Sequence, residues 1–311
     1  MIKETKLVTY KVNGDKKIQF SFCLIKGKQP GPIICITAGI HGCEYPGIVA
    51  AIKLFNELKP EDVTGTVKIL TISNLPAFEE RVMFVCPVDN VNPNRVYPGK
   101  KDGSYSEILV HYQLNEFIKG SDYYIDLHGG DMVEDLIPFS MVHKTGKQEI
   151  DQKSKKLAEF YGLPNIVTTS SDGDWTDKGT SYASASEIGI PAIIAEVGRI
   201  GQLEDGDVQM HLKGLYNVLR YIGCLKGVPQ KKENLIYYKD FIWLRAKSKG
   251  IFYSKYKVGK EVKIGEELGT IEDYFGSSIN KIEAPVSGRI LFLTTSPSIK
   301  EKGVLLAIGV K

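Results

Sequence analysis

The chain has 311 residues, which is long for a single hydrophobic core and predicts one large domain followed by a small one. The net charge of +3 is spread along the sequence and excludes the basic footprint of a nucleic-acid-binding or membrane-surface protein. No apolar run approaches 18 residues, the N-terminus lacks signal-peptide features, and the five cysteines form no CxxC pair, so we expect a cytoplasmic protein with reduced thiols.

The first elements in chain order predict a hairpin and then a strand-helix-strand unit. Residues 6–26 alternate apolar and polar side chains around Asn13 and Gly14, the strongest short hairpin signal. Residues 33–37 are apolar and mostly β-branched and predict a buried strand, whereas residues 47–59 carry apolar side chains at helical spacing. A second strand at 65–72 completes a βαβ unit.

The turn after the first buried strand carries the first candidate metal ligands, His41 and Glu44. A His-x-x-Glu match alone is common by chance and is weak evidence for a metal site. A second apolar strand at 123–127 ends in the same way, with His128 followed by two glycines. Cys43 lies between the first two ligands, and its plainer interpretation is a small packing residue.

The middle of the chain predicts a long ordered loop and further helices and strands. Residues 73–104 form an irregular segment, which is either functional or a surface loop held by Asx turns. Glu196 ends an apolar strand at 192–197, where a carboxylate needs either a structural ion-pair partner or an active-site role. Helices are predicted at 106–118, 150–161, 181–187 and 207–223, and residues 172–176 predict a loop.

The composition changes at the polar, lysine-rich segment 227–234. Beyond it, short strands punctuated by glycine show no helical periodicity. We therefore expect a catalytic domain at 1–230 and a small all-β domain at 231–311.

Four ordered motifs resemble the succinylglutamate desuccinylase/aspartoacylase family, the deacylase branch of the zinc carboxypeptidase-like superfamily. They are residues 39–44 with His41 and Glu44, residues 92–99 with Asn94 and Arg95, residues 126–128 ending in His128, and residues 196–198 beginning with Glu196. The resemblance implies an α/β fold in which helices flank a mixed sheet.

The resemblance also implies a site. His41, Glu44 and His128 would bind one Zn²⁺, which leaves a fourth position for water, as in catalytic zinc sites. Glu196 would then be the general base and later the general acid. Asn94 and Arg95 would hold a substrate carboxylate, Arg81 is the one candidate for a further family arginine, and Asp126 would orient the site from behind His128.

The C-terminal part resembles a biotinyl/lipoyl barrel around residues 258–269 and 282–288. Carrier domains place a modifiable lysine at the turn between these halves. Here the turn at 272–277 contains no lysine. We therefore expect a structural or substrate-shielding barrel.

The main functional hypothesis is a zinc-dependent hydrolase that cleaves the amide bond of a small N-acylated amino acid or a related compound. One alternative is a metallocarboxypeptidase acting on short peptides, because its zinc chemistry would be the same. Another is a non-catalytic binding protein, which the intact ligand set and Glu196 disfavour. The expected partner is a small molecule with a carboxylate, with no nucleic acid and no membrane, and assembly into a homo-oligomer stays open.

Overall fold

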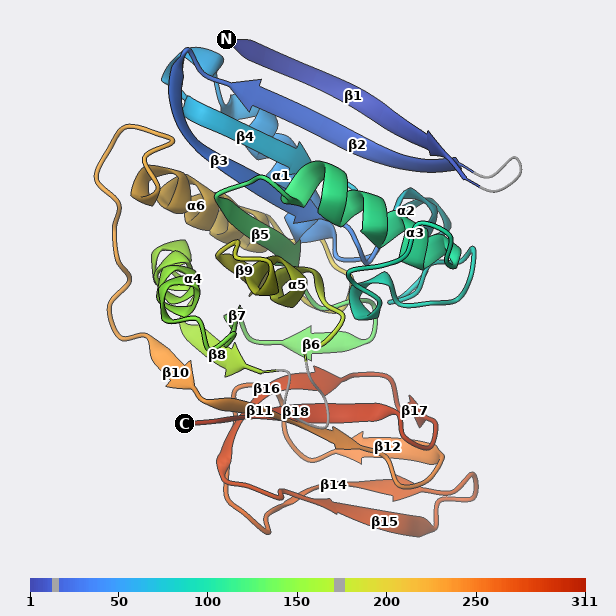
Figure 1. The fold of residues 1–311 in the computed structure, drawn as a ribbon. Coiled ribbons are helices and arrows are strands. Elements are labelled where there is room, and N and C mark those ends of the chain that lie inside the picture. The colour runs from blue at the N-terminus through green and yellow to red at the C-terminus, as the bar shows by residue number, and fades with distance from the viewer. Residues whose placement is uncertain (13–16, 171–176) are drawn as a thin grey trace.

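A large mixed β-sheet forms the centre of the fold (Figure 1). The computed structural model describes residues 1–12, 17–170 and 177–311. The neighbouring strands β4, β3, β5 and β9 are parallel, whereas β1, β2 and β7 join the sheet by antiparallel pairing. Among the described residues the strands are, in spatial order, β1 (Ile2–Lys11), β2 (Lys17–Lys26), β4 (Thr64–Leu70), β3 (Gln29–Ala38), β5 (Tyr123–His128), β9 (Ala192–Glu196), β7 (Phe139–His143), β8 (Asn165–Thr169) and β10 (Ile236–Tyr238).

Helices cover both faces of this sheet, as expected for an α/β protein. One face packs against α1 (Tyr45–Glu57), α4 (Gln148–Tyr161) and α6 (Asp205–Tyr221). The other packs against α5 (Ser181–Glu187) and α3 (Tyr105–Tyr112), which continues as a π-helix over Gln113–Ile118. The short α2 (Leu75–Glu80) and the 3₁₀ turns Pro60–Asp62 and Pro93–Arg95 lie in connecting segments.

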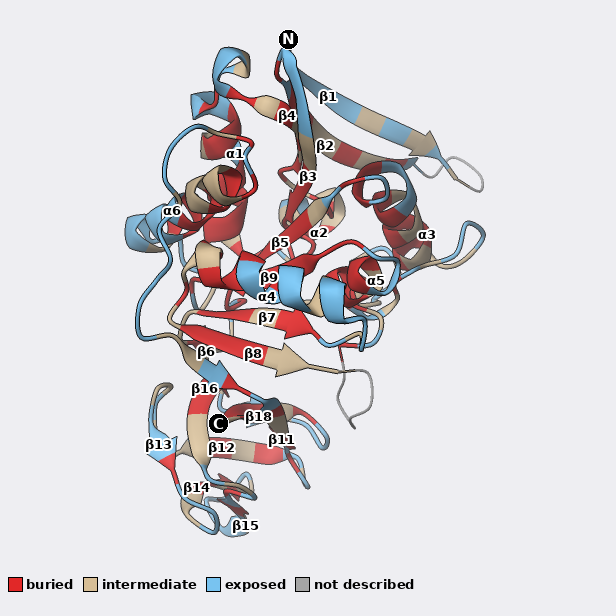
Figure 2. Ribbon diagram, turned by 60° about the vertical axis from the view of Figure 1, so that its left-hand side comes forward, coloured by how far each residue is buried: buried red, intermediate tan, exposed pale blue. Residues whose placement is uncertain are grey.

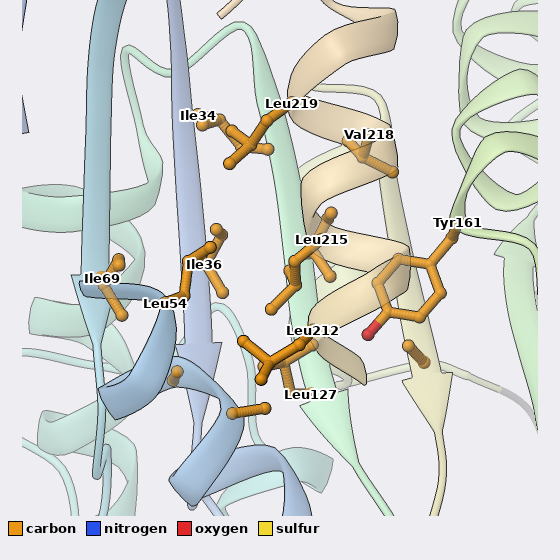
Figure 3. Close-up of a cluster of buried hydrophobic side chains, with 14 of the residues drawn as sticks. Ile34, Ile36, Leu54, Ile69, Leu127, Tyr161, Leu212, Leu215, Val218 and Leu219 are labelled. Atoms are coloured by element: carbon orange, nitrogen blue, oxygen red, sulfur yellow. The ribbon is translucent and has the colours of Figure 1, made fainter. Parts of the chain in front are cut away.

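The core between the sheet and the first helical face consists mostly of aliphatic side chains, together with aromatic ones such as Tyr161 (Figure 3). Ile36 of β3 and Leu127 of β5 are fully buried, as are Leu54 of α1 and Leu215 of α6. Burying a side chain of this size contributes about 1.5–3 kcal/mol before entropy is subtracted. Figure 2 shows the result: β5 and β9 are buried along most of their length, and α4, α5 and α6 each carry exposed residues as well as buried ones. This packing fixes the strand ends that carry the site.

The C-terminal part forms two antiparallel sheets that share a hydrophobic core. The closed barrel predicted from the sequence is not confirmed, because the strands of the described residues belong to two separate sheets. One sheet contains β11 (Asp240–Arg245), β18 (Val304–Val310), β16 (Gly288–Thr294), β13 (Glu261–Val262) and β6 (Glu134–Leu136), and the other contains β15 (Ser278–Glu283), β14 (Glu267–Glu272), β12 (Gly250–Ser254) and β17 (Ser298–Ile299).

Two strand pairings tie the C-terminal part to the main sheet. After the predicted boundary at 230, β10 first pairs in parallel with β8. In the opposite direction, β6 leaves the larger part and pairs with β16. A hydrophobic cluster that includes Phe139, Phe241 and Phe292 fills the space between them. Hydrogen bonds and apolar contacts therefore both hold the C-terminal sheets against the end of the large sheet.

The predicted N-terminal hairpin is confirmed by the antiparallel pairing of β1 with β2, from Ile2 opposite Lys26 to Lys11 opposite Lys17. Its predicted turn at Asn13 and Gly14 lies outside the described residues, as does the predicted loop at 172–176. No helix in the described part of the chain is long and apolar enough to span a membrane.

Candidate active site

Three neighbouring parallel strands bring the candidate ligands to one edge of the sheet. His41 and Glu44 follow β3, His128 ends β5, and Glu196 ends β9. The strands are adjacent in the order β3, β5, β9, and His128 lies directly opposite Glu196. Ligand sites in open α/β sheets form at the carboxyl ends of strands, and this edge is such a site.

His41, Glu44 and His128 form a tight buried cluster. One ligand atom from each residue lies within 4.8 Å of the other two. The Glu44 carboxylate is central: Oε1 lies 2.7 Å from Nδ1 of His41, and Oε2 lies 2.9 Å from Nδ1 of His128. The exposed fractions of the three residues are 8%, 3% and 2% in sequence order. Both imidazoles therefore present the same nitrogen, Nδ1, to one point.

The opposite nitrogen of each imidazole faces a hydrogen-bond acceptor. Nε2 of His41 lies 3.1 Å from Oδ1 of Asn92, and Nε2 of His128 lies 3.1 Å from Oδ2 of Asp126. Asp126 is itself fixed, because it accepts hydrogen bonds from Thr37 and Ser181. Acceptors at both Nε2 atoms favour the tautomer whose Nδ1 lone pair faces the cluster.

Two glycines allow the backbone to approach this closely. A Cβ atom on Gly42 would lie 2.3 Å from the backbone of Ala77, and one on Gly129 would lie 2.4 Å from the carbonyl oxygen of Val197. The Gly129 amide also donates a hydrogen bond to Oε2 of Glu44. The glycines beside the ligands in the sequence thus have a packing role as well as a turn role.

The cluster is electrostatically coupled. Burial opposes charge on Glu44 and on His128, yet attraction between opposite charges prevails. His41 and His128 lower the pKa of Glu44 to about 2, and Glu44 and Asp126 raise the pKa of His128 well above its usual value. Two imidazole nitrogens and one carboxylate oxygen, each held by an outer hydrogen bond, form the donor set of a catalytic zinc site. The residues present therefore fit a zinc ion.

Glu196 lies beside this cluster in the same cavity. Burial raises the pKa of its carboxyl group to about 8, and the charges of Glu44 and Asp126 act in the same direction, whereas His128 and Arg95 oppose them. No ion pair of Glu196 occurs among the described residues, so the structural salt bridge considered from the sequence is not observed. A carboxyl group held in this range can exchange a proton near neutral pH.

Asn94 and Arg95 enter the cavity from the turn Pro93–Arg95. Oδ1 of Asn94 accepts a hydrogen bond from the Ser181 amide, and its Nδ2 lies 3.3 Å from Nε2 of His128. Nη1 of Arg95 donates to the Asn94 carbonyl oxygen at 2.6 Å. Arg95 is exposed, and it lines the cavity.

The cavity has a volume of about 650 Å³ and two different walls. The strand ends of the large sheet and the turn Pro93–Arg95 supply the metal cluster, Glu196 and Arg95, and the C-terminal sheets supply Phe241, Trp243 and Arg245 among others. Arg81 is not among the described residues that line it, because Arg81 is exposed at the end of α2. The neighbouring residues Met83 and Phe84 line the cavity instead.

Two further residues of the site, Asn92 and Glu134, were not predicted to have a role. Oδ1 of Asn92 accepts hydrogen bonds from both His41 and the Asn94 amide, and its place in the 92–99 motif was the available signal. Glu134 begins β6 and lines the cavity, and burial together with the charge of Glu44 holds its pKa well above the usual value. No local pattern marks Glu134, because the C-terminal sheet holds it in place through β16.

Known proteins are similar to this chain in sequence and in fold. An N-alpha-acetyl-L-2,4-diaminobutyric acid deacetylase of Halomonas elongata is 28% identical over 258 residues, covering 81% of this chain and 74% of the relative. The product-bound structure of the ectoine utilization protein EutE (DoeB) from Ruegeria pomeroyi superposes with a TM-score of 0.88 at 25% identity, covering 99% of this chain and 95% of that one. A succinylglutamate desuccinylase/aspartoacylase structure from Rhodobacter sphaeroides gives a TM-score of 0.87 at 22% identity over the same shares.

The family match covers most of the chain and all of the candidate ligands. The model of the succinylglutamate desuccinylase/aspartoacylase catalytic domain matches residues 30–222. That range contains His41, Glu44, His128, Glu196 and the 92–99 motif. The chain belongs to the succinylglutamate desuccinylase/aspartoacylase family.

Proposed function

We propose that this protein is a zinc-dependent deacylase that hydrolyses the amide bond of a small N-acylated amino acid. The observation that carries the proposal is the convergence of His41, Glu44 and His128 beside Glu196 in one walled cavity. Zinc held by these three residues would supply a Lewis acid for the amide carbonyl and would lower the pKa of bound water to about 7.

The proton steps are assigned to Glu196. Its carboxylate takes a proton from the attacking water and then gives it to the nitrogen of the leaving amine, so that the group ends in its starting state. A pKa close to the pH of the reaction medium suits both the uptake and the release of the proton. Burial, together with the charges of Glu44 and Asp126, raises the Glu196 pKa in that direction. Glu196 is therefore the proposed general base and acid.

Arg95 is the proposed ligand of the substrate carboxylate. Its guanidinium is accessible from the cavity, and its backbone position is fixed by the turn that also carries Asn94. A guanidinium offers two parallel N–H donors to a carboxylate, which fixes direction as well as charge. Asp126 is proposed to orient the His128 imidazole. Asn94 is proposed to fix the position of Arg95 relative to His128, because it contacts both residues.

The relatives support the amide class of substrate. The Halomonas elongata protein is a deacetylase of an N-acetylated diamino acid by its name, and the family model is named for a desuccinylase and an aspartoacylase. Phe241, Trp243 and Phe292 line the cavity on the side of the C-terminal sheets, and a cavity bounded in this way favours a small substrate over a peptide.

A substrate panel tests the proposal. The purified protein, loaded with zinc, is assayed against N-acetyl and N-succinyl amino acids beside dipeptides of the same residues. We expect turnover of acyl amino acids and little or none of the dipeptides. Release of amino acids from the dipeptides alone would show that the protein is a carboxypeptidase and not a deacylase. Absence of any turnover would favour a non-catalytic binding protein.

A further inference from the structure

Ser181 is a buried residue that contacts two different parts of the site, and the proposed deacylase mechanism assigns it no role. It is the first residue of α5, the short helix that packs against β5 and β9 (Figure 1). The residue is fully buried. Its two polar groups, the side-chain hydroxyl and the backbone amide, make hydrogen bonds to different residues of the site.

The hydroxyl group of Ser181 acts on the metal side of the site. Oγ donates a hydrogen bond to Oδ2 of Asp126, the same oxygen that lies 3.1 Å from Nε2 of His128. A serine at the start of a helix often caps that helix by accepting a backbone hydrogen bond. In the described structure α5 has no side-chain cap, and the Ser181 hydroxyl is directed to Asp126 instead. The contact with Asp126 therefore accounts for this hydroxyl better than helix capping does.

The backbone amide of Ser181 acts on the substrate side of the site. Its N–H donates to Oδ1 of Asn94 at 2.9 Å, and the carbonyl oxygen of Asn94 accepts from Nη1 of Arg95 at 2.6 Å. The first N–H groups of a helix have no acceptor within the helix, so α5 does not need this donor for itself. Asn94 is buried, and buried amide oxygens need a donor from the protein or from ordered water.

The chain just before α5 also packs against the turn that carries Arg95. The amide of Tyr97 donates to the carbonyl oxygen of Gly179 at 2.9 Å. Gly179 has a φ of +81°, and a Cβ atom there would lie 2.3 Å from the carbonyl oxygen of Arg95. Both the backbone conformation and the contact exclude a side chain at this position. This close approach holds the start of α5 against the turn Pro93–Arg95.

We propose that Ser181 is a positioning residue that fixes the metal ligand His128 and the substrate-binding residue Arg95 relative to each other. Its hydroxyl acts on His128 through Asp126, and its amide acts on Arg95 through Asn94. The inference rests on the proposed deacylase function, in which zinc binds at His128 and the substrate carboxylate at Arg95. One small substrate must reach both points at once, so their spacing affects binding and turnover.

Two substitutions separate the two polar groups of Ser181. Ser181→Ala removes the hydroxyl and keeps the amide donor. Ser181→Pro removes both, because proline has no N–H, and proline is well accepted at the first position of a helix. The preceding residue, Thr180, has a φ of −89° and a ψ of 159°, a conformation that a following proline favours. The difference between the two variants therefore reports the amide.

Zinc affinity, measured by competition with a chelator, tests the hydroxyl. We expect Ser181→Ala to weaken zinc binding by about threefold to tenfold, because Asp126 loses one of the groups that orient it but keeps Thr37. Ser186→Ala is the matched control, since Ser186 is a buried serine of the same helix whose Oγ has no hydrogen-bond partner among the described residues. Its zinc affinity should equal that of the wild-type protein. Equal zinc affinities of Ser181→Ala and Ser186→Ala would overturn the role of the hydroxyl.

The route through Asp126 is tested by combining two changes. In an Asp126→Asn background, Ser181→Ala should weaken zinc binding by no more than about twofold, because the group through which it acts has already been changed. The same threefold to tenfold loss in both backgrounds would show that Ser181 acts on zinc independently of Asp126, and it would overturn this route.

Substrate affinity tests the amide. KM is measured at saturating zinc for the N-acetyl amino acid that the wild-type protein hydrolyses fastest. We expect Ser181→Ala to stay within about threefold of the wild-type KM, and Ser181→Pro to raise KM by about tenfold or more, because Oδ1 of Asn94 loses its donor. Equal KM values for the two variants would overturn the role of the amide. The zinc measurements do not depend on whether Ser181→Pro folds.

Failure of the deacylase function would look different. The wild-type protein would then turn over no N-acetyl amino acid, while zinc affinity would still separate Ser181→Ala from Ser186→Ala. The amide would be tested by titration calorimetry of N-acetylalanine with the wild-type protein, Ser181→Ala and Ser181→Pro, all loaded with zinc. Weaker binding in Ser181→Pro alone would retain its positioning role. Equal binding to all three proteins, or binding to none, would reject it.

Discussion

His128 and Glu196 lie directly opposite one another at the carboxyl ends of the adjacent parallel strands β5 and β9. The pairing places a candidate metal ligand and a candidate proton carrier side by side through backbone hydrogen bonds alone. Their relative position is therefore set by the sheet rather than by a loop. Sites built on such rigid elements hold their geometry more accurately than sites on loops.

Glu196→Gln should keep zinc and lose turnover by about a hundredfold to ten-thousandfold, because the amide has the shape of the carboxylate but cannot carry the proton. Zinc content is measured by elemental analysis and turnover by release of the free amino acid. The wild-type protein prepared in parallel is the control. A variant that loses its zinc would show that Glu196 supports the metal rather than the proton transfer.

Arg95→Lys should keep zinc and raise KM with a smaller effect on kcat, because an ammonium group cannot supply the two parallel donors of a guanidinium. We expect a loss in kcat/KM of about tenfold or more. Arg81→Lys is the comparison, since Arg81 lies at the exposed end of α2 and its change should be nearly neutral. A larger loss of kcat/KM in Arg81→Lys than in Arg95→Lys would indicate that Arg81, and not Arg95, binds the substrate carboxylate.

Asp126→Asn should weaken zinc binding by about tenfold to a hundredfold, because the carboxylate fixes the His128 tautomer that presents Nδ1 to the metal. The dissociation constant is measured by competition with a chelator of known affinity. Thr37→Val removes a hydrogen bond to Asp126 without touching His128, and it should have a smaller effect. Equal affinities for Asp126→Asn and the wild-type protein would mean that the tautomer is set elsewhere.

The stability of the protein should fall on acidification because of the buried residue His211, which is not one of the candidate ligands. Burial lowers the pKa of His211 to about 4, and its Nδ1 lies 2.7 Å from the Tyr161 hydroxyl. The unfolded chain, with a histidine pKa of about 6.5, then binds more protons than the folded chain between pH 6.5 and pH 4. The free energy of unfolding should therefore decrease over that window, by up to about 3 kcal/mol from this group.

Urea unfolding of the wild-type protein and of His211→Gln at several pH values measures the contribution of His211 to the pH dependence of the free energy of unfolding. Glutamine does not titrate, so the free energy of unfolding of the variant should depend less on pH between 6.5 and 4. Parallel curves for the two proteins would exclude His211 as a source of the acid sensitivity.

Ending the chain at residue 231 should destabilise the remaining part, although all of the candidate ligands precede that point. The truncation removes β10 from the edge of the large sheet and β16 from its pairing with β6. It also uncovers apolar side chains such as Leu136 and Phe139. We expect aggregation or a lower melting temperature in thermal unfolding. A soluble fragment with unchanged stability would show that the two parts are independent.

Much of the large domain could be predicted from the sequence, because its elements are local and strongly periodic. The helix predicted at 181–187 matches α5, and the strand and helix predicted at 33–37 and 47–59 match β3 and α1 with shifted ends. The strands β7 and β8 were not predicted. They are short and contain polar residues such as Ser140 and Asn165, and the partners of the Asn165 side chain, Pro138 and Tyr238, come from distant parts of the chain.

The same division applies to the site. His41, Glu44 and His128 follow short strands in recognisable motifs, and the structure brings them together. Glu134 carries no such local signal. It reaches the cavity because β6 pairs with a strand more than 150 residues later. Sequence patterns report local structure, whereas the position of Glu134 depends on the tertiary fold.

The most direct test of the account measures zinc and activity in the same samples. The wild-type protein is stripped with a chelator, refilled with zinc, and compared with His128→Ala by elemental analysis and by turnover of an N-acetyl amino acid. The account predicts about one zinc per chain, loss of turnover on stripping, recovery on refilling, and neither zinc nor turnover in the variant. Full turnover in the stripped protein, or zinc retained by His128→Ala with its activity intact, would contradict it.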